Sequence, residues 1–178
     1  MTDLERFKSV ALCRALALDT ETTGFGHKAE MLSCAFVGLD ELEKPELMFE
    51  ILVQPEVATE WYYAQKVNHI SPEDVKDCKT LHTYGGSISN LVKDSPLLAW
   101  NMKFDRPFFK GYTDTASDHI CLMRAYTEFK GRKKVTNIKT AAEELGIAFD
   151  TDSAHDAVYD ATVLMQIAVK LSSLLEDS

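Results

Sequence analysis

Two carboxylates that lie two residues apart are the clearest chemical feature of the chain. Asp19 and Glu21 follow an apolar stretch that begins at Val10, and Thr-Thr-Gly comes directly after them. Side chains of a β-strand alternate between its faces, so both acids would point the same way at a strand end. Two such carboxylates repel each other unless a proton or a divalent cation lies between them. The pattern indicates metal-dependent chemistry on a phosphate, although a solvated pair is a common alternative in a chain with 28 acidic residues.

A second polar group follows a short apolar run that Pro96 opens. Asn101 and Asp105 are four residues apart, so they share a face if the segment is helical. Because proline is tolerated only near the start of a helix, Pro107 requires the helix to begin close to Phe104 or to be kinked there. Asp105 alone could equally be a helix cap.

A third group lies where the last helix should begin. His155 and Asp160 are five residues apart, which is about 140° around an ideal helix. They converge only if His155 lies in the loop before the helix and Asp160 in its first turns, with Asp152 or Ser153 as the cap. The near-neutral pKa of histidine suits a general base. A lone histidine at this position could also be a surface or capping residue.

In chain order, Asp-Thr-Glu-Thr-Thr-Gly, Asn-x-x-x-Asp and His-x-x-x-x-Asp resemble the three motifs of the DEDDh exonucleases. These are the DnaQ-like proofreading exonucleases of the ribonuclease H-like superfamily. The resemblance extends from about residue 12 to about residue 171, and one departure is Val-Asn-His-Ile at 67–70, where relatives often have Val-His-Gly-Ile. It implies a 3′–5′ exonuclease that releases 5′-mononucleotides from the 3′ end of single-stranded nucleic acid, with DNA favoured over RNA.

The resemblance also implies a role for each residue of the three motifs. The four carboxylates would organise two divalent cations, Mg²⁺ or Mn²⁺, and they are Asp19, Glu21, Asp105 and Asp160. Two ions about 3.5–4 Å apart would activate water and stabilise the entering and leaving oxygens of an in-line displacement. Asp19 would bridge the two ions, and His155 would take the proton from the attacking water.

Residues next to the motifs are candidates for binding the substrate: Thr22, Thr23, Gly24, Phe25, Asn101 and Trp61. Phe25 stands where the family commonly has a hydrophobic side chain that wedges against the terminal bases, and an aromatic ring there could stack on a base. Its alternative is a hydrophobic loop anchor. The aromatic triplet at 61–63 could be either packing residues or a platform for a base. Thr22 and Thr23 could bond to the terminal sugar.

The order of apolar runs predicts an α/β protein. Strand-like runs near 11–20, 31–39 and 47–53 have connections short enough for an antiparallel meander. A helix near 80–94, which Gly85 and Gly86 weaken, precedes a strand at 97–100, and the chain is mostly helical from about 103 onward. We therefore expect one domain over residues 1–178 with a central mixed sheet of three antiparallel strands plus parallel strands, flanked by helices. The resemblance makes this the ribonuclease H-like fold.

Composition bounds the function and the cellular location. A net charge of −9 argues against a protein that grips long duplexes, but not against a nuclease that binds one chain end. The basic cluster at 130–134 is either a solvated loop or a guide for the incoming strand. Cys13 and Cys34 fall in expected core strands without a Cys-x-x-Cys pair, which favours reduced thiols and a cytoplasmic location.

No signal peptide and no apolar run approaching about 18 residues are found, so we expect no membrane span. The chain ends soon after the last expected helix, without a tail that would tether it to a polymerase, and the pattern leaves the oligomeric state open. Two other functions remain. One is a binding module that has lost its chemistry, although no carboxylate of the set is missing. The other is a metal-dependent phosphohydrolase of nucleotides or very short oligonucleotides, which the low basic content favours.

Overall fold

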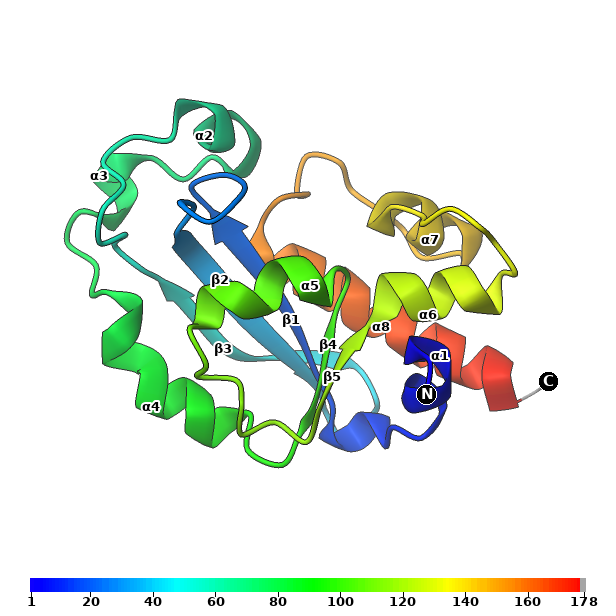
Figure 1. The fold of residues 1–178 in the computed structure, drawn as a ribbon. Helices are drawn as coiled ribbons and strands as arrows, with labels where there is room; N and C mark the ends of the chain where they lie inside the picture. Colours follow the sequence, from blue (N-terminus) through cyan, green and yellow to red (C-terminus); the bar gives the residue numbers. More distant parts are fainter. Residues whose placement is uncertain (177–178) are drawn as a thin grey trace.

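A five-stranded mixed sheet forms the centre of the molecule, with helices on both faces (Figure 1). The computed structural model describes residues 1–176. The strands lie in the order β3-β2-β1-β4-β5, in which the first three are antiparallel and β1, β4 and β5 are parallel. Their bounds are β1 (Leu16–Thr22), β2 (Met31–Leu39), β3 (Pro45–Leu52), β4 (Pro96–Ala99) and β5 (Asp118–Cys121). This arrangement confirms the predicted α/β class, with its antiparallel meander and added parallel strands.

The helices divide between the two faces and one end of the sheet (Figure 1). Helices α1, α6, α7 and α8 share a core cluster on one face, and α4, α5 and η2 share a second cluster on the other. Helices α2 and α3 lie beyond the carboxyl end of β1. Their bounds are α1 (Asp3–Lys8), the 3₁₀ helix η1 (Leu12–Arg14), α2 (Tyr62–Asn68), α3 (Pro72–Val75), α4 (Leu81–Leu91), α5 (Met102–Asp105), the 3₁₀ helix η2 (Arg106–Phe109), α6 (Leu122–Phe129), α7 (Ile138–Glu144) and α8 (Ala157–Glu176).

Strand β1 divides its side chains between the two cores. Ala17 belongs to the cluster under α8, whereas Leu18 belongs to the cluster under α4. Because faces alternate along a strand, Asp19 and Glu21 continue the face toward α8, and Thr20 continues the face of Leu18. The two acids therefore leave the core on the side where α8 begins.

The first strand is shorter at its start than the apolar run predicted. Residues 12–14 form the 3₁₀ helix η1 instead, and Cys13 is exposed, so its prediction as a core residue was wrong. Pairing with the neighbouring strands begins only at Leu16 and Ala17, so the residues before them have no ladder to join. Cys34 is buried in β2, as expected.

The two adjacent glycines of α4 have different surroundings. A Cβ added to Gly85 would lie 2.3 Å from a ring carbon of Tyr112, whereas one added to Gly86 would meet nothing within 4 Å. The Tyr112 hydroxyl lies 2.7 Å from Nδ1 of His82. The backbone carbonyl of Tyr112 accepts a hydrogen bond of 2.9 Å from the Ser89 hydroxyl. Gly85 thus lets α4 pack directly on the Tyr112 ring.

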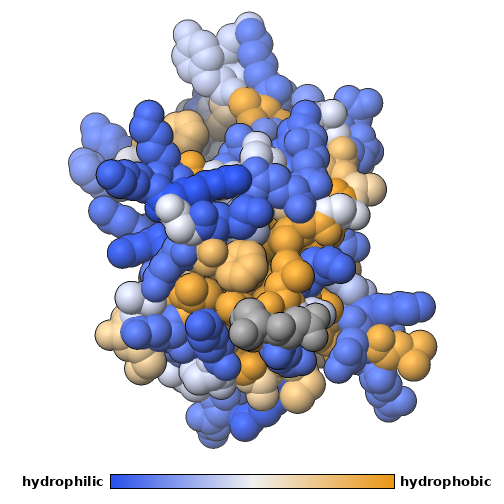
Figure 2. Space-filling model, turned by 90° about the vertical axis from the view of Figure 1, so that its right-hand side faces the viewer, coloured by the Kyte–Doolittle hydropathy of each residue, from blue (hydrophilic) through white to orange (hydrophobic). Residues whose placement is uncertain are grey.

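Helix α8 is the longest helix in the part of the chain that the structure describes. By length and composition alone it could cross a membrane, with a mean hydropathy of 1.3 over 18 residues. Core helices of folded domains pass the same test. Its apolar side chains pack against β1 and β2, and the buried ones include Ala161, Leu164, Met165, Ala168 and Leu171. Packing on the sheet accounts for its buried side chains, which make up 39% of the apolar window. On the side of the molecule where α8 ends, hydrophobic side chains lie at the surface among hydrophilic ones (Figure 2).

Candidate active site

The three polar groups of the sequence meet at one cavity of about 960 Å³ beyond the carboxyl end of β1. Of the catalytic set, strand β1 supplies two acids, α5 supplies one, the loop before α8 supplies the histidine and the first turns of α8 supply the fourth acid. The five residues of the predicted catalytic set that line the cavity are Asp19, Glu21, Asp105, His155 and Asp160. They come from segments separated by more than eighty and by fifty residues of chain.

A single carboxylate caps the start of α8. Oδ1 of Asp156 accepts a hydrogen bond of 2.9 Å from the backbone N–H of Tyr159. The predicted caps, Asp152 and Ser153, were wrong, because the Ser153 hydroxyl instead donates to Asp150 within the preceding turn. Asp156 is the better cap since it directly precedes the first helical residue.

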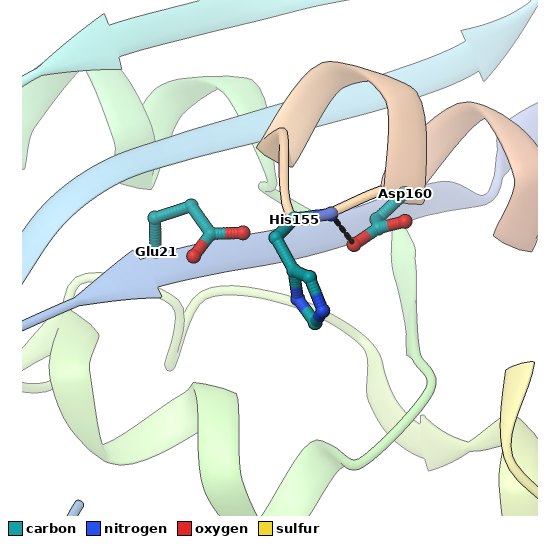
Figure 3. Close-up of side chains that lie close together, drawn as sticks. All are labelled: Glu21, His155 and Asp160. Atoms are coloured by element: carbon teal, nitrogen blue, oxygen red, sulfur yellow. Dashed lines mark hydrogen bonds between the residues drawn. The ribbon is translucent and has the colours of Figure 1, made fainter. Parts of the chain in front are cut away.

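His155 lies in the loop before α8 and Asp160 in the first turns of the helix, as the spacing required. The backbone N–H of His155 donates to Oδ2 of Asp160 over 3.1 Å, and the His155 backbone is left-handed with φ of 66°. Glu21, His155 and Asp160 each offer one ligand atom, and these atoms lie within 4.8 Å of one another (Figure 3). The imidazole is exposed, so it can act within the cavity.

Asp105 is held from the neighbouring strand. Its Oδ1 accepts a hydrogen bond of 2.8 Å from the Thr20 hydroxyl, and the residue is only 4% exposed. Asp105 directly precedes η2, but its side chain makes no cap hydrogen bond there, so the alternative in which it is merely a helix cap is not supported. Helix α5 ends at Asp105 and continues as a 3₁₀ helix that contains Pro107, so the proline changes the type of helix at this point.

The surroundings of the four acids disfavour their ionised forms. Burial raises the pKa of Glu21 to about 8, with Asp160 adding to the effect. Burial likewise raises the pKa of Asp105 to about 7, although the Thr20 hydroxyl opposes the shift. The pKa of Asp19 is raised well above its usual range by burial and then by its acidic neighbours, Asp105 first. The pKa of Asp160 is also raised, chiefly by burial. A divalent cation would offset these unfavourable charges.

The donor set fits a hard divalent cation. Oδ1 of Asp160 is buried and has no hydrogen-bond partner among the described residues, while its other oxygen holds the His155 backbone. A buried carboxylate oxygen without a partner is costly, so this atom is suited to be a ligand. Carboxylate oxygens are the ligands that Mg²⁺ and Mn²⁺ prefer.

All six residues that the sequence predicted to bind substrate also line the cavity: Thr22, Thr23, Gly24, Phe25, Asn101 and Trp61. Phe25 is 92% exposed, and the centre of its ring is 5.8 Å from that of Phe104. The Thr22 hydroxyl donates to the carbonyl of Gly24. The Thr23 hydroxyl oxygen accepts from the backbone N–H of Glu30. These threonines therefore shape the loop that carries Phe25.

Trp61 both lines the cavity and packs inside the molecule. It is 5% exposed and clusters with Leu32 and Val75, and its indole N–H donates to the carbonyl of Ile70. Of the two roles that the sequence left open, these contacts favour packing. The next two residues, Tyr62 and Tyr63, are exposed and line the cavity instead.

The sequence interpretation missed the part played by Asn68. Its side-chain N–H donates to the carbonyl of Thr22 over 3.1 Å, and its Oδ1 accepts from the backbone N–H of Ile70. The Asn68 side chain also opposes the rise in the pKa of Glu21. The only sign of this role in the sequence was Val-Asn-His-Ile at 67–70, which differs from the Val-His-Gly-Ile that relatives often have. Trp100, Phe104 and Ile138 also line the cavity, and only the tertiary fold brings them there.

Comparison with known proteins identifies one family. The model of the Exonuclease family, RNase_T, matches residues 16–168. Among curated proteins, none matches the sequence.

Several solved structures share the fold. One described as a full-length 3′-exonuclease has 18% identity and a TM-score of 0.71, over 92% of this chain and 81% of that one. A 3′-exonuclease described as recognising the 3′ end of a histone mRNA stem-loop has 18% identity and a TM-score of 0.74, over 93% and 65%. Exonuclease I of E. coli with a dT13 oligonucleotide has 17% identity and a TM-score of 0.70, over 92% and 42%. The chain thus spans less than two thirds of the last two proteins, and these likenesses concern the fold.

Proposed function

The chain belongs to the Exonuclease (RNase_T) family, and we propose that it is a 3′–5′ exonuclease that releases 5′-mononucleotides from the 3′ end of single-stranded nucleic acid. Family membership makes it a nuclease of the hydrolase class. The observation that carries the finer proposal is the convergence of four carboxylates and one histidine, from three separate segments, on a single cavity.

Exonucleases of this family generally use divalent metal ions. We assign four ligands for two ions, Mg²⁺ or Mn²⁺: Asp19, Glu21, Asp105 and Asp160. When bound, such ions activate water and neutralise charge that develops on the phosphate. The protein prepares the site by holding Asp105 with the Thr20 hydroxyl, and among the described residues Oδ1 of Asp160 has no hydrogen-bond partner.

His155 is the proposed general base. Its ring is exposed beside Glu21 and Asp160, and it would accept the proton of the attacking water at a ring nitrogen. The backbone bond to Asp160 places the loop, so the ring itself is free for proton transfer. Asp160 thus has two proposed roles: it is a metal ligand, and it holds the backbone of His155, the proposed base.

The substrate proposal rests on the cavity and on what similar folds bind. Phe25 offers an exposed aromatic face for a terminal base. The two similar folds are described with a dT13 strand and with a histone mRNA 3′ end, which supports a nucleic-acid chain end as the substrate. Either sugar is compatible with this support, and DNA is our first choice.

Matched single-stranded DNA and RNA, each labelled at the 5′ end, test the proposal. We expect a descending ladder and 5′-mononucleotide products with Mg²⁺ or Mn²⁺, no activity in EDTA, and a block by a 3′-phosphate. Calcium should restore little, because its looser coordination suits in-line geometry poorly. Cleavage of a closed circular strand would instead show an endonuclease. Hydrolysis of free nucleotides without a ladder would show a small-molecule phosphohydrolase.

A further inference from the structure

The cavity has an unusual charge balance for a site that binds a polyanion. Among the described residues that line it, none is Lys or Arg, and five are acidic: Asp19, Glu21, Glu60, Asp105 and Asp160. Proteins that follow a long single strand use a positively charged groove along its backbone. Apart from the charge that bound cations would supply, none of the described residues that line this cavity can neutralise a run of phosphates.

Four of the seven basic side chains near the second motif and in the 130–134 cluster lie beside acids outside the cavity. Each of four such cations lies within ion-pair distance of an acid. The pairs are Arg106 with Asp114 at 3.0 Å, Lys110 with Glu56 at 2.8 Å, Lys130 with Glu144 at 3.8 Å and Arg132 with Glu144 at 2.8 Å. None of these seven cations lines the cavity, so a phosphate-binding track within the cavity does not include them.

The cavity instead offers exposed aromatic rings. Tyr62 and Tyr63, in the first turn of α2, are 63% and 84% exposed, and their rings pack edge to face at 5.6 Å. The Lys66 ammonium lies 4.3 Å from the centre of the Tyr62 ring, which helps to hold the pair. Phe25, from the loop after β1, is a further exposed ring on the same cavity. Exposed rings of this kind can stack on bases of any sequence.

We propose that the preferred substrates are very short oligonucleotides, of about two to four nucleotides, which suits a cavity within the range of small-ligand sites. They are held by stacking of bases on Tyr62 and Tyr63 and not by contacts to a long phosphate backbone. The inference rests on the proposed exonuclease function and specifies its substrate class.

A length series measures the first consequence. We expect kcat/KM at constant Mg²⁺ to be as high for strands of two to four nucleotides as for strands of about 30. The dependence on salt should be weak. In a plot of log kcat/KM against log KCl concentration between about 50 and 200 mM, we expect a slope shallower than about −1.4, the value for two phosphate contacts. A steeper slope, or kcat/KM that rises with length beyond four nucleotides, overturns the inference.

Substitution of the tyrosines measures the second consequence. Tyr62→Ala with Tyr63→Ala should lower kcat/KM for a trinucleotide by about 5- to 150-fold, the equivalent of one stacked base, mainly through KM. Tyr62→Phe with Tyr63→Phe keeps the rings and should restore the wild-type value. Because both side chains are exposed, the melting temperature should not change. Unchanged kinetics in the alanine variant would refute the stacking site.

Two further outcomes separate this inference from the proposed function. Lys133→Ala with Lys134→Ala should leave cleavage of every strand length unchanged, and a selective loss on long strands would overturn the inference by showing a backbone track. Metal-dependent ladders on long strands alone would also overturn it but would leave the exonuclease proposal intact. Absence of hydrolysis on all lengths, with metal present, would refute both.

Discussion

At the scale of single residues, the backbone of His155 has a structural role and its side chain has the proposed catalytic role. The backbone N–H binds Asp160, and the left-handed φ of 66° turns the chain into α8. Histidine adopts this conformation less readily than glycine or asparagine. The imidazole makes none of these contacts. A substitution of the ring can therefore leave the loop in place while it removes the proposed base.

His155→Ala and His155→Asn should each lower kcat by about 10²–10⁴, because general base catalysis is lost. The residual rate should recover as pH rises, since hydroxide can replace the missing base. Asparagine tolerates a left-handed backbone, so it separates catalysis from strain. Stabilisation by added Mn²⁺ should persist in both variants, as measured by thermal unfolding. His27→Ala, in an exposed loop, is the control, and near-normal turnover of His155→Ala would leave His155 as a structural residue only.

Asp19→Ala should have a different signature from the histidine variants. Loss of the proposed bridging ligand should abolish turnover and also the rise in melting temperature that metal produces in the wild type. The remaining acids would be too few to hold a pair of ions. Thermal unfolding with and without Mn²⁺ measures this, and a metal-induced rise of wild-type size would contradict the bridging role.

At the scale of elements, the sequence predicts what local pattern determines. Strand β1 and helix α8 were recognisable from apolar spacing and the break after Asp105 from Pro107, although the cap of α8 and the first residues of β1 were predicted wrongly. Strand β5 escaped because it is short and pairs with β4 only through contacts distant in sequence, such as Leu97 with His119. Asn68 escaped for the same reason, since its function depends on a carbonyl that lies 46 residues away in the chain.

Helix α4 offers a matched pair of tests. Gly85→Ala should destabilise the protein by about 1–3 kcal/mol, because the added methyl overlaps the Tyr112 ring and forces it to move. Gly86→Ala meets nothing and should stabilise by about 0.5–1 kcal/mol through helix propensity. Urea unfolding measures both free energies. Equal effects would contradict the packing assigned to Gly85.

At the scale of the whole molecule, the acidic cluster couples stability to pH and to metal. Burial raises the pKa of Glu21 to about 8 and that of Asp105 to about 7 in the folded state. The folded protein then binds more protons than the unfolded chain between the ordinary carboxyl pKa and these values. Stability from this source is complete below the ordinary pKa and disappears as pH rises through the folded values.

In chelator, the melting temperature should therefore fall as pH is raised from about 6 to about 9. Added Mg²⁺ or Mn²⁺ should raise it, most strongly at the alkaline end, because the ions bind the ionised form. Differential scanning fluorimetry measures both effects. Glu21→Gln should flatten the dependence on pH, and a wild-type melting temperature that rises with pH in chelator would contradict the charge assignment.

Oδ1 of Asp160, which has no partner among the described residues, and the crowded acids lower the stability of the fold while they serve the proposed activity. Substitutions such as Asp105→Asn that end turnover should also relieve the electrostatic cost of the buried acids. Selection for thermal stability alone would therefore favour the loss of these acids. The acidic set should then persist only where hydrolysis itself is selected.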